Sequence, residues 1–167
     1  MAAVHRSQGM GSRGLGIPSL LVFVGLCYAV AAIGGIASAD AGEVYRGLDR
    51  PPWAPPSWLF GPVWTVLYGM IGVSAWLIWR KAGAAARTPL IWWGVQLAVN
   101  LAWTPLFFGA GEYGLALADI GLLLVAAGVT VVLFRRVRPA AAALLLPYVL
   151  WVGYAAALNL SIWLANT

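Results

Sequence analysis

The chain of 167 residues has few charged side chains, one cysteine and one histidine. Asp, Glu, Lys and Arg make up 9% of it and hydrophobic residues 62%, whereas about a quarter of a typical soluble domain is charged. Ten basic and five acidic side chains cannot cover the surface of a soluble globule of this length. The single cysteine excludes a disulfide framework, and one histidine leaves too few ligands for a Cys/His metal centre.

The net charge of +5 does not indicate nucleic-acid binding, because the basic residues lie between apolar segments and form no continuous basic face. Twenty glycines and ten prolines without a period exclude collagen and argue against disorder. What the chain has in abundance is long apolar segments and tryptophan, of which there are ten.

Five apolar segments are long enough to cross a membrane, which takes about 20 residues of helix. They are continuous and do not alternate as the strands of a membrane barrel would. The sequence therefore predicts an all-α membrane protein, a single bundle of five transmembrane helices over 17–167. The expected spans are 17–39, 61–79, 88–108, 113–134 and 139–165, with a basic tail at 1–16 and an ordered Pro/Trp-rich loop at 40–60.

The basic residues predict the orientation of the bundle, since Lys and Arg collect on the cytoplasmic side of a membrane. Only Arg46 and Arg50 lie on the side of the first loop. The other eight precede the first span or lie between spans two and three or four and five: Arg6, Arg13, Arg80, Lys81, Arg87, Arg135, Arg136 and Arg138. We expect a cytoplasmic N-terminus, a C-terminus outside and, from the Ala/Gly-rich composition, a bacterial cell membrane.

The first span has an alternative interpretation as a secretory signal, because Ala37-Ser38-Ala39 resembles a cleavage site. The uncharged segment is longer than the usual apolar core of a signal peptide. It also contains Gly25/Ala29 and Ala31/Gly35, small residues at the spacing that lets membrane helices approach closely. We therefore expect a retained helix.

The loop at 40–60 contains four prolines, which remove backbone donors and predict neither helix nor strand. Trp53 and Trp58 lie among them. By physical chemistry alone these indoles are typical of anchors at the membrane interface, and an ordered cover over the bundle is the alternative.

Four blocks of sequence resemble the TspO/MBR family, the tryptophan-rich sensory proteins that include the mitochondrial translocator protein, or peripheral-type benzodiazepine receptor. The first block is the loop, which reads Tyr45-x-x-Leu48-x-Arg50-Pro51-Pro52-Trp53-x-Pro55-Pro56. The others cover residues 61–68, 96–109 and, in the last span, 147–151 with 155–159. The resemblance begins at about residue 20, follows the order of the family and implies its five-helix plan.

Trp64 and Trp151 lie well inside predicted spans, away from the interfaces where tryptophan collects. A buried indole needs a partner for its N–H or a ligand to stack on, and helix packing is the alternative. The resemblance implies that both line a cavity for porphyrins or drug-like ligands. In some bacterial members the two tryptophans are implicated in light-dependent porphyrin breakdown, which makes them the candidate catalytic residues.

Two helical stripes supply the remaining candidates. Asn100, Trp103 and Phe107 share a face of the third span, where Asn100 could equally hold two helices together. Trp151, Ala155 and Leu158 share a face of the fifth span, after a kink expected at Pro147. With the resemblance, the candidate ligand-binding residues are Tyr45, Trp53, Trp64, Tyr68, Asn100, Trp103, Phe107, Pro147, Trp151, Ala155 and Leu158.

Polar groups within the spans are few. Asp119 is the one acid expected inside a span; without a basic partner it assembles no proton relay, and we expect it to hydrogen-bond a neighbouring helix. No metal site is expected, and Cys27 is the one thiol near the predicted cavity. The cholesterol-recognition stretch that the family's translocator proteins carry is missing from 158–166, which has neither Tyr nor a basic residue, so cholesterol binding there is doubtful.

Three functions fit this sequence. The leading hypothesis, which rests on the resemblance, is a membrane sensor or regulator that binds a tetrapyrrole, protoporphyrin IX or haem, as ligand and has no obligatory cofactor. The alternatives are a transporter of porphyrins or other amphiphiles and a light-dependent porphyrin-degrading enzyme. No carboxylate pair or histidine is available for acid–base catalysis. The expected partners are the lipid bilayer, this ligand and, from small-residue pairs such as Ala98/Ala102, a second copy of the chain.

Overall fold

The computed structural model describes residues 16–37 and 39–167. Residues 1–15 of the expected tail and Ser38 of the suspected cleavage sequence lie outside the described residues. Within them the chain is almost entirely helical and has no strand.

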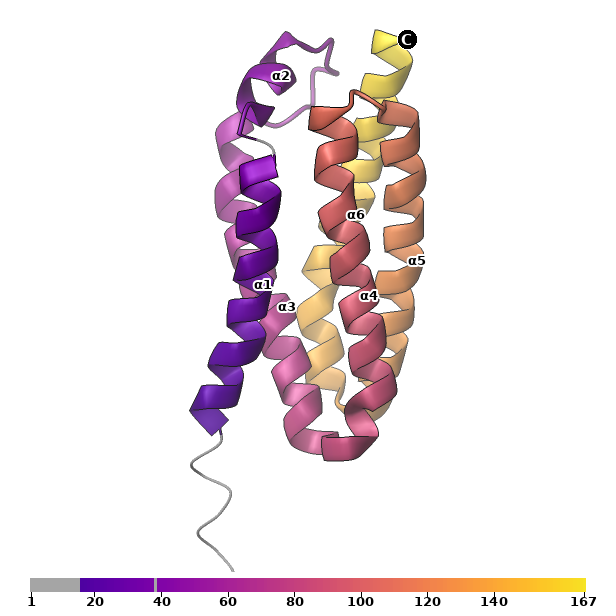
Figure 1. Ribbon diagram of the computed structural model, residues 1–167. Helices are drawn as coiled ribbons and strands as arrows, with labels where there is room; N and C mark the ends of the chain where they lie inside the picture. The colour runs from indigo at the N-terminus through magenta and orange to yellow at the C-terminus, as the bar shows by residue number, and fades with distance from the viewer. Residues whose placement is uncertain (1–15, 38) are drawn as a thin grey trace, which may run out of the picture.

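Five long helices run up and down in one bundle (Figure 1). They are α1 (Gly16–Ala37), α3 (Phe60–Ala82), α4 (Arg87–Thr104), α5 (Tyr113–Val137) and α6 (Pro139–Asn166). Four continuous helical stretches are long and apolar enough to cross a membrane, and one of these, Ser57–Gly109, is 53 residues long. It contains both α3 and α4, because the chain reverses at the short 3-10 helix η2 (Gly83–Ala86). The predicted all-α membrane bundle of five helices is confirmed.

Glycine and proline mark the helix ends. Gly83 follows α3 with a φ of 52°, a left-handed conformation that glycine adopts without a steric penalty. At Pro105 the α-helix ends, and the chain continues as one π-helical turn, η3 (Pro105–Gly109). Gly111, with a φ of 67°, then turns the chain into α5.

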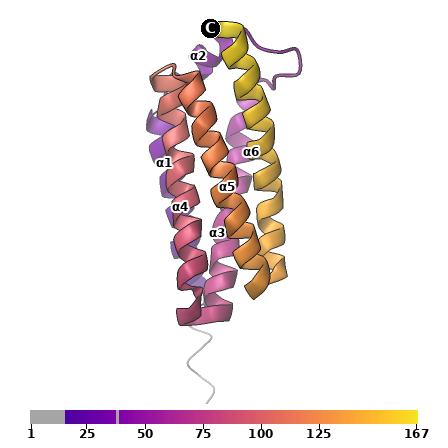
Figure 2. The ribbon, with the colours of Figure 1, turned by 90° about the vertical axis from the view of Figure 1, so that its right-hand side faces the viewer.

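The long helices form a ring in the order α1, α3, α6, α5, α4 (Figures 1 and 2). Helices α1 and α4 close the ring along a shorter line of contact than the other neighbouring pairs. The closest approach of α1 to α3 is at Gly72, where an added Cβ would lie 2.8 Å from the Cα of Val24. Glycine is therefore required at this crossing.

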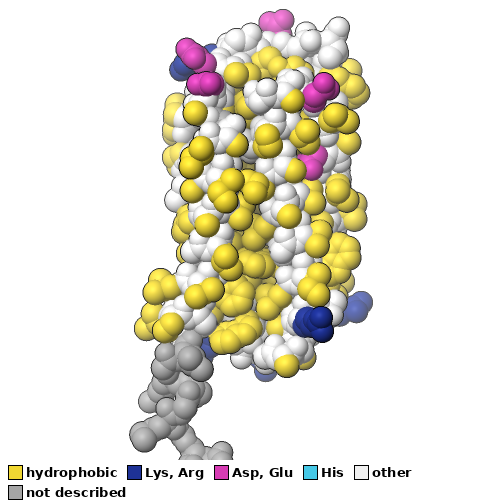
Figure 3. Space-filling view, in the orientation of Figure 1, with side chains coloured by type: hydrophobic (Ala, Val, Ile, Leu, Met, Phe, Trp, Pro, Cys, Tyr) yellow, Lys and Arg dark blue, Asp and Glu magenta, His cyan; other side chains and the backbone are white. Residues whose placement is uncertain are grey.

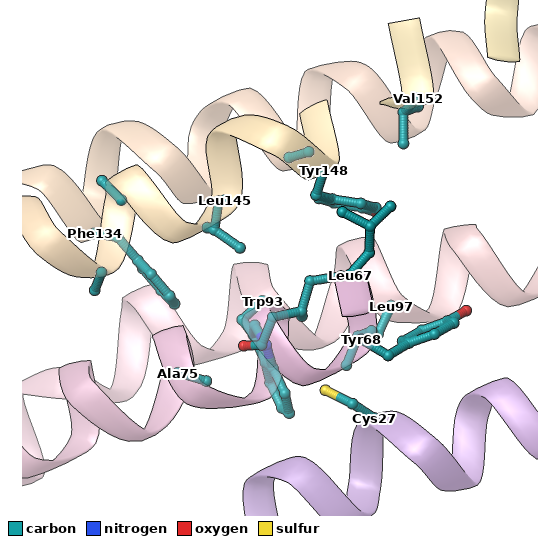
Figure 4. Close-up of a cluster of buried hydrophobic side chains, with 14 of the residues drawn as sticks. Cys27, Leu67, Tyr68, Ala75, Trp93, Leu97, Phe134, Leu145, Tyr148 and Val152 are labelled. Carbon is teal, nitrogen blue, oxygen red and sulfur yellow. The ribbon is translucent and has the colours of Figure 1, made fainter. Parts of the chain in front are cut away.

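A hydrophobic core fills the end of the ring nearest the α3–α4 and α5–α6 turns, and side chains from all five long helices meet in it (Figure 4). Its members there include Ile78, Trp93, Phe134, Ala141 and Leu145, each at most 7% exposed. The cluster continues toward the other end of the bundle, where it includes Ile120 and Val152. The end of the bundle near the α3–α4 and α5–α6 turns is therefore filled by packed side chains.

The loop after α1 covers the opposite end of the bundle and contains α2 (Ala41–Gly47) and the 3-10 turn η1 (Ser57–Leu59). The expectation that this loop has no helix is wrong for 41–47, which precede the prolines. It holds for Pro51–Pro56, where no regular structure forms.

Two side chains of α6 hold this loop. The Asn166 amide accepts from the N–H of Asp49 (3.1 Å) and donates to its carbonyl (3.0 Å). The Tyr154 hydroxyl donates to the Trp53 carbonyl at 3.1 Å. The loop is therefore an ordered cover attached mainly to one helix.

Most charged side chains lie toward the two ends of the bundle, with a largely apolar band between them that one acidic side chain interrupts (Figure 3). The ends of α3 and α5 carry Arg80, Lys81, Arg135 and Arg136 at the packed end. Glu43, Asp49 and Glu112 lie at the end that the loop covers. The orientation predicted from the sequence stays a prediction.

Candidate functional site

A cavity of about 380 Å³ lies inside the ring at the loop-covered end. This volume is within the range of small-molecule sites, about 300–1,000 Å³. All five long helices contribute to its wall, and Tyr45 of α2 contributes from the loop. The predicted residues that the structure brings together around it are Tyr45, Trp64, Tyr68, Asn100, Trp103, Phe107, Trp151, Ala155 and Leu158.

Two of the predicted residues do not line the cavity. Trp53 is 48% exposed on the outside of the loop, where its ring meets Tyr154 edge-on at 5.6 Å. Pro147 is exposed on the outer face of α6, which continues through it as one helix. Trp53 therefore helps to attach the loop to α6, and Pro147 can affect only the direction of α6.

Trp64 and Trp151 stand on neighbouring helices, α3 and α6, and both line the cavity. The Trp64 ring lies 5.4 Å from that of Tyr68, and the Trp151 ring lies 6.1 Å from that of Phe60. Neither indole N–H has a hydrogen-bond partner among the described residues. The cavity wall therefore contains two aromatic surfaces whose donors are unused.

A chain of hydrogen bonds lies below these indoles and joins α3, α4 and α6. The Tyr68 hydroxyl donates to Asn100 Oδ1 (2.7 Å), and Asn100 Nδ2 donates to the Tyr148 hydroxyl (3.3 Å). Tyr148 in turn donates to Gln96 Oε1 at 2.6 Å, while Gln96 Nε2 has no partner in the described chain. Asn100 therefore joins three helices and also lines the cavity, while its role in ligand binding stays a prediction.

The end of the cavity near η3 is built from aromatic rings. Trp103 stacks on Phe107 with centroids 4.9 Å apart and meets Phe108 edge-on at 5.7 Å. The Trp103 N–H donates to Asn159 Oδ1 (3.1 Å), and the Asn159 amide donates to the Tyr113 carbonyl (2.8 Å). Unlike Trp64 and Trp151, this indole is fixed in place by its own hydrogen bond.

Tyr45 closes the cavity from the loop side and is 3% exposed. Its hydroxyl donates to the Pro55 carbonyl at 2.9 Å, and the Arg50 guanidinium lies 4.6 Å from the centre of its ring. Burial raises the pKa of the Tyr45 phenol above its ordinary value, and Arg50 offsets part of this increase. The phenol therefore remains a neutral donor throughout the physiological pH range.

The sequence missed the contribution of α1 to the wall. Tyr28, Ala31, Gly34 and Gly35 line the cavity, opposite Thr65 of α3. The spacing of residues 28, 31 and 35 places them on one helix face, which was the available signal. In a span that is apolar on every side, however, this face is not distinguishable from the others.

The small residues of α1 also do not all act as the spacing suggested. Gly25 is exposed and a Cβ there would meet nothing within 4 Å. Gly35 lines the cavity. Gly25 and Gly35 therefore do not form the close helix–helix contacts within one chain that their spacing suggested.

Asp119 and Cys27 also depart from expectation. Asp119 Oδ2 is buried without a hydrogen-bond partner in the described residues, so the predicted bond to a neighbouring helix is not formed by this oxygen. Cys27 is fully buried in the core and does not line the cavity, which removes its thiol as a ligand for a bound metal.

The site thus consists of aromatic walls, two unpaired indole donors and a polar floor of hydrogen-bonded tyrosine and amide side chains. Among the described residues, no three His, Cys, Asp or Glu side chains lie close enough together to hold a metal ion. Such a cavity is suited to holding an apolar, flat molecule. The fold and the cavity together define a class: a five-helix integral membrane protein with a loop-covered aromatic cavity.

Comparison with known proteins places the chain more narrowly. The model of the TspO/MBR family matches residues 23–164. The translocator protein of Homo sapiens is 43% identical over 125 residues, 73% of this chain and 74% of the relative. The tryptophan-rich protein TspO of Chlorobaculum tepidum is 36% identical over 155 residues, 90% of this chain and 97% of the relative. Protein CrtK of Rhodobacter capsulatus is 37% identical over 150 residues, 87% of this chain and 91% of the relative. The protein belongs to the TspO/MBR family.

Proposed function

We propose that this protein is a membrane sensor or regulator that binds a tetrapyrrole, with free-base protoporphyrin as the preferred chemistry, in the cavity under the loop. The observation that carries the proposal is the pair Trp64 and Trp151, two cavity-lining indoles whose N–H groups are unpaired in the described structure. Flat aromatic ligands gain dispersion and offset stacking on such rings.

The polar groups of the wall support binding rather than acid–base chemistry. Tyr68 and Asn100 are occupied with each other and with Tyr148. No carboxylate lines the cavity, so a general acid or base for hydrolysis or group transfer is missing from its described lining.

Free-base porphyrin fits the described cavity better than haem does. Cys27 is buried away from the cavity, and the lining contains tyrosine hydroxyls but neither histidine nor cysteine. Tyr45 and Tyr68 use their hydroxyls on Pro55 and Asn100. An iron centre would therefore find few free ligands, whereas a metal-free ring needs only stacking and burial.

The test is titration of the purified protein with protoporphyrin IX, followed by the porphyrin's own absorption. Trp64→Phe and Trp151→Phe should each weaken binding by about threefold to tenfold, because an indole stack and a donor are lost. Trp58→Phe is the matched control, since Trp58 is 70% exposed and does not line the cavity. Absence of saturable binding by the wild-type protein would contradict the proposal.

The same sample separates the two alternative functions. Loss of porphyrin absorption under illumination, abolished by Trp64→Phe or Trp151→Phe, would favour light-dependent breakdown. Vectorial uptake of porphyrin into sealed proteoliposomes would favour transport. Saturable binding with neither effect is the outcome that the proposal predicts.

A further inference from the structure

We propose that the cavity opens sideways into the hydrocarbon of the bilayer through a window between α1 and α3, and that planar apolar ligands reach it from the lipid. The Tyr28 side chain extends across this window and partly blocks it. The proposed function supplies the ligand class, but the window itself rests on separate observations.

The first observation is where the cavity wall is exposed. Four of the cavity-lining residues are themselves exposed: Tyr28, Gly35, Gly61 and Thr65. All four lie on α1 and α3. The described lining residues of α4, α5, α6 and the loop are half-buried or buried. The exposed part of the lining therefore lies on this one pair of neighbouring helices.

The second observation is the shape of the rim. A Cβ placed on Gly35 or on Gly61 would meet nothing within 4 Å, so both glycines border open space. Because α1 and α3 are antiparallel, Gly35 near the end of α1 is level with Gly61 near the start of α3. Residues 28–35 extend over about 10 Å of helix, from the middle of α1 toward the loop. The window therefore faces the half of the hydrocarbon nearer the loop.

The third observation is a hydrogen bond that crosses the window. Tyr28 lies in the middle of α1, is 40% exposed, and its hydroxyl donates to the Thr65 carbonyl at 3.0 Å. Tyrosine in membrane proteins collects at the interfaces, so a mid-span tyrosine needs such a partner. The Thr65 hydroxyl is bonded within its own helix, to the Gly61 carbonyl at 2.9 Å. The rim thus presents apolar surface and satisfied polar groups to the lipid.

More hydrogen bonds hold the loop in place than cross the window. Asn166 binds both backbone groups of Asp49, Tyr154 binds Trp53, and Tyr45 binds Pro55. Among the described residues, the bond from Tyr28 to the Thr65 carbonyl crosses the window. A molecule dissolved in the bilayer therefore has a shorter and less obstructed path than one in water.

Substitution at two exposed glycines of α1 tests the window. Gly35→Leu places a side chain in the rim, and Gly25→Leu, also exposed and also with open space at its Cβ, is the matched control outside the cavity lining. Proteoliposomes are mixed with vesicles that carry protoporphyrin IX, and quenching of tryptophan fluorescence gives the rates of uptake and release. Gly35→Leu should slow both rates by about tenfold or more, whereas Gly25→Leu should leave them unchanged.

Tyr28→Phe should accelerate both rates by about threefold to tenfold, because it removes one hydrogen bond in a membrane. Rates that respond to Asn166→Ala and not to Gly35→Leu would assign access to the loop and overturn the window.

A second measurement is independent of porphyrin. A photoactivated phenyl diazirine dissolved in the lipid is flashed shortly after mixing, and labelled peptides are identified by mass spectrometry. The cavity-lining residues Trp151, Ala155 and Leu158 should be labelled in the wild type and in Gly25→Leu, and at least about fivefold less in Gly35→Leu, whereas the exposed Ala157 should be labelled equally in all three. Equal labelling in the two variants would overturn the window even where porphyrin binds. Absence of porphyrin binding with the expected labelling pattern would contradict the proposed function alone.

Discussion

Trp64 and Trp151 differ from Trp93 and Trp103 in what their N–H groups bind. The indole of Trp93 donates to the Ile71 carbonyl and that of Trp103 to Asn159, so both are held by the protein itself. Trp64 and Trp151 have rings as neighbours but no acceptor in the described chain. At the scale of the residue, the distinction between a packed tryptophan and one available to a ligand therefore depends on a single hydrogen bond.

Ala155 is a second residue at which side-chain size decides the function. It lines the cavity one turn beyond Trp151, and Ala157, two positions further along α6, is exposed. Ala155→Leu should weaken protoporphyrin binding by about 1–3 kcal/mol, because the added atoms occupy ligand space. Ala157→Leu should bind normally. Titration of the two variants beside their thermal unfolding curves tests this, and an unchanged Kd for Ala155→Leu would exclude it from the site.

At the scale of the element, α1 is the helix least enclosed by the others. Most of its large side chains are exposed, and its described neighbours are chiefly α3 and, along a shorter line, α4. Its position depends on the close approach at Gly72, where the backbone of Val24 leaves no room for a side chain. Helix α1 is thus both a wall of the cavity and the wall that a substitution can most easily displace.

Gly72→Ala should destabilise the protein by about 1–3 kcal/mol, because the new methyl group meets the α1 backbone. Gly94→Ala in α4, where a Cβ would meet nothing within 4 Å, should instead stabilise it by about 0.5–1 kcal/mol through helix propensity. Denaturation of the two variants in the same detergent measures the difference. Equal unfolding free energies would show that α1 does not depend on this crossing.

The long helices could be predicted from sequence because each is a long apolar segment bounded by charge, proline or glycine. Helix α2 could not, since its seven residues precede prolines that dominate any local prediction. The tryptophans of the cavity were identified through family motifs. Tyr28 and Gly35 were missed because α1 is apolar on every face, so no pattern separates the side toward a cavity from the side toward lipid.

At the scale of the whole molecule, the two ends of the bundle have different construction. One end is a packed core flanked by basic turns, and the other is a cavity under an ordered loop that carries acidic residues. Lys and Arg favour the cytoplasmic side. The predicted orientation would put the packed end in the cytoplasm and the cavity end outside.

Single cysteines in a Cys27→Ala background test this orientation. Ala84, in the turn between α3 and α4, and Glu43, in α2, are both exposed. A membrane-impermeant maleimide added to intact cells should label Glu43→Cys and not Ala84→Cys, and inverted vesicles should give the opposite result. Labelling of Glu43→Cys from the cytoplasmic side would reverse the proposed orientation.

The clamp between Asn166 and Asp49 also has a consequence for biogenesis. Its two partners are separated by 117 residues, nearly the full length of the bundle. During synthesis the loop emerges after the first helix, but the amide that fastens it arrives only with the end of the last. Until α6 is inserted in the membrane this clamp cannot form, so the loop gains its Asn166 attachment only with the last helix.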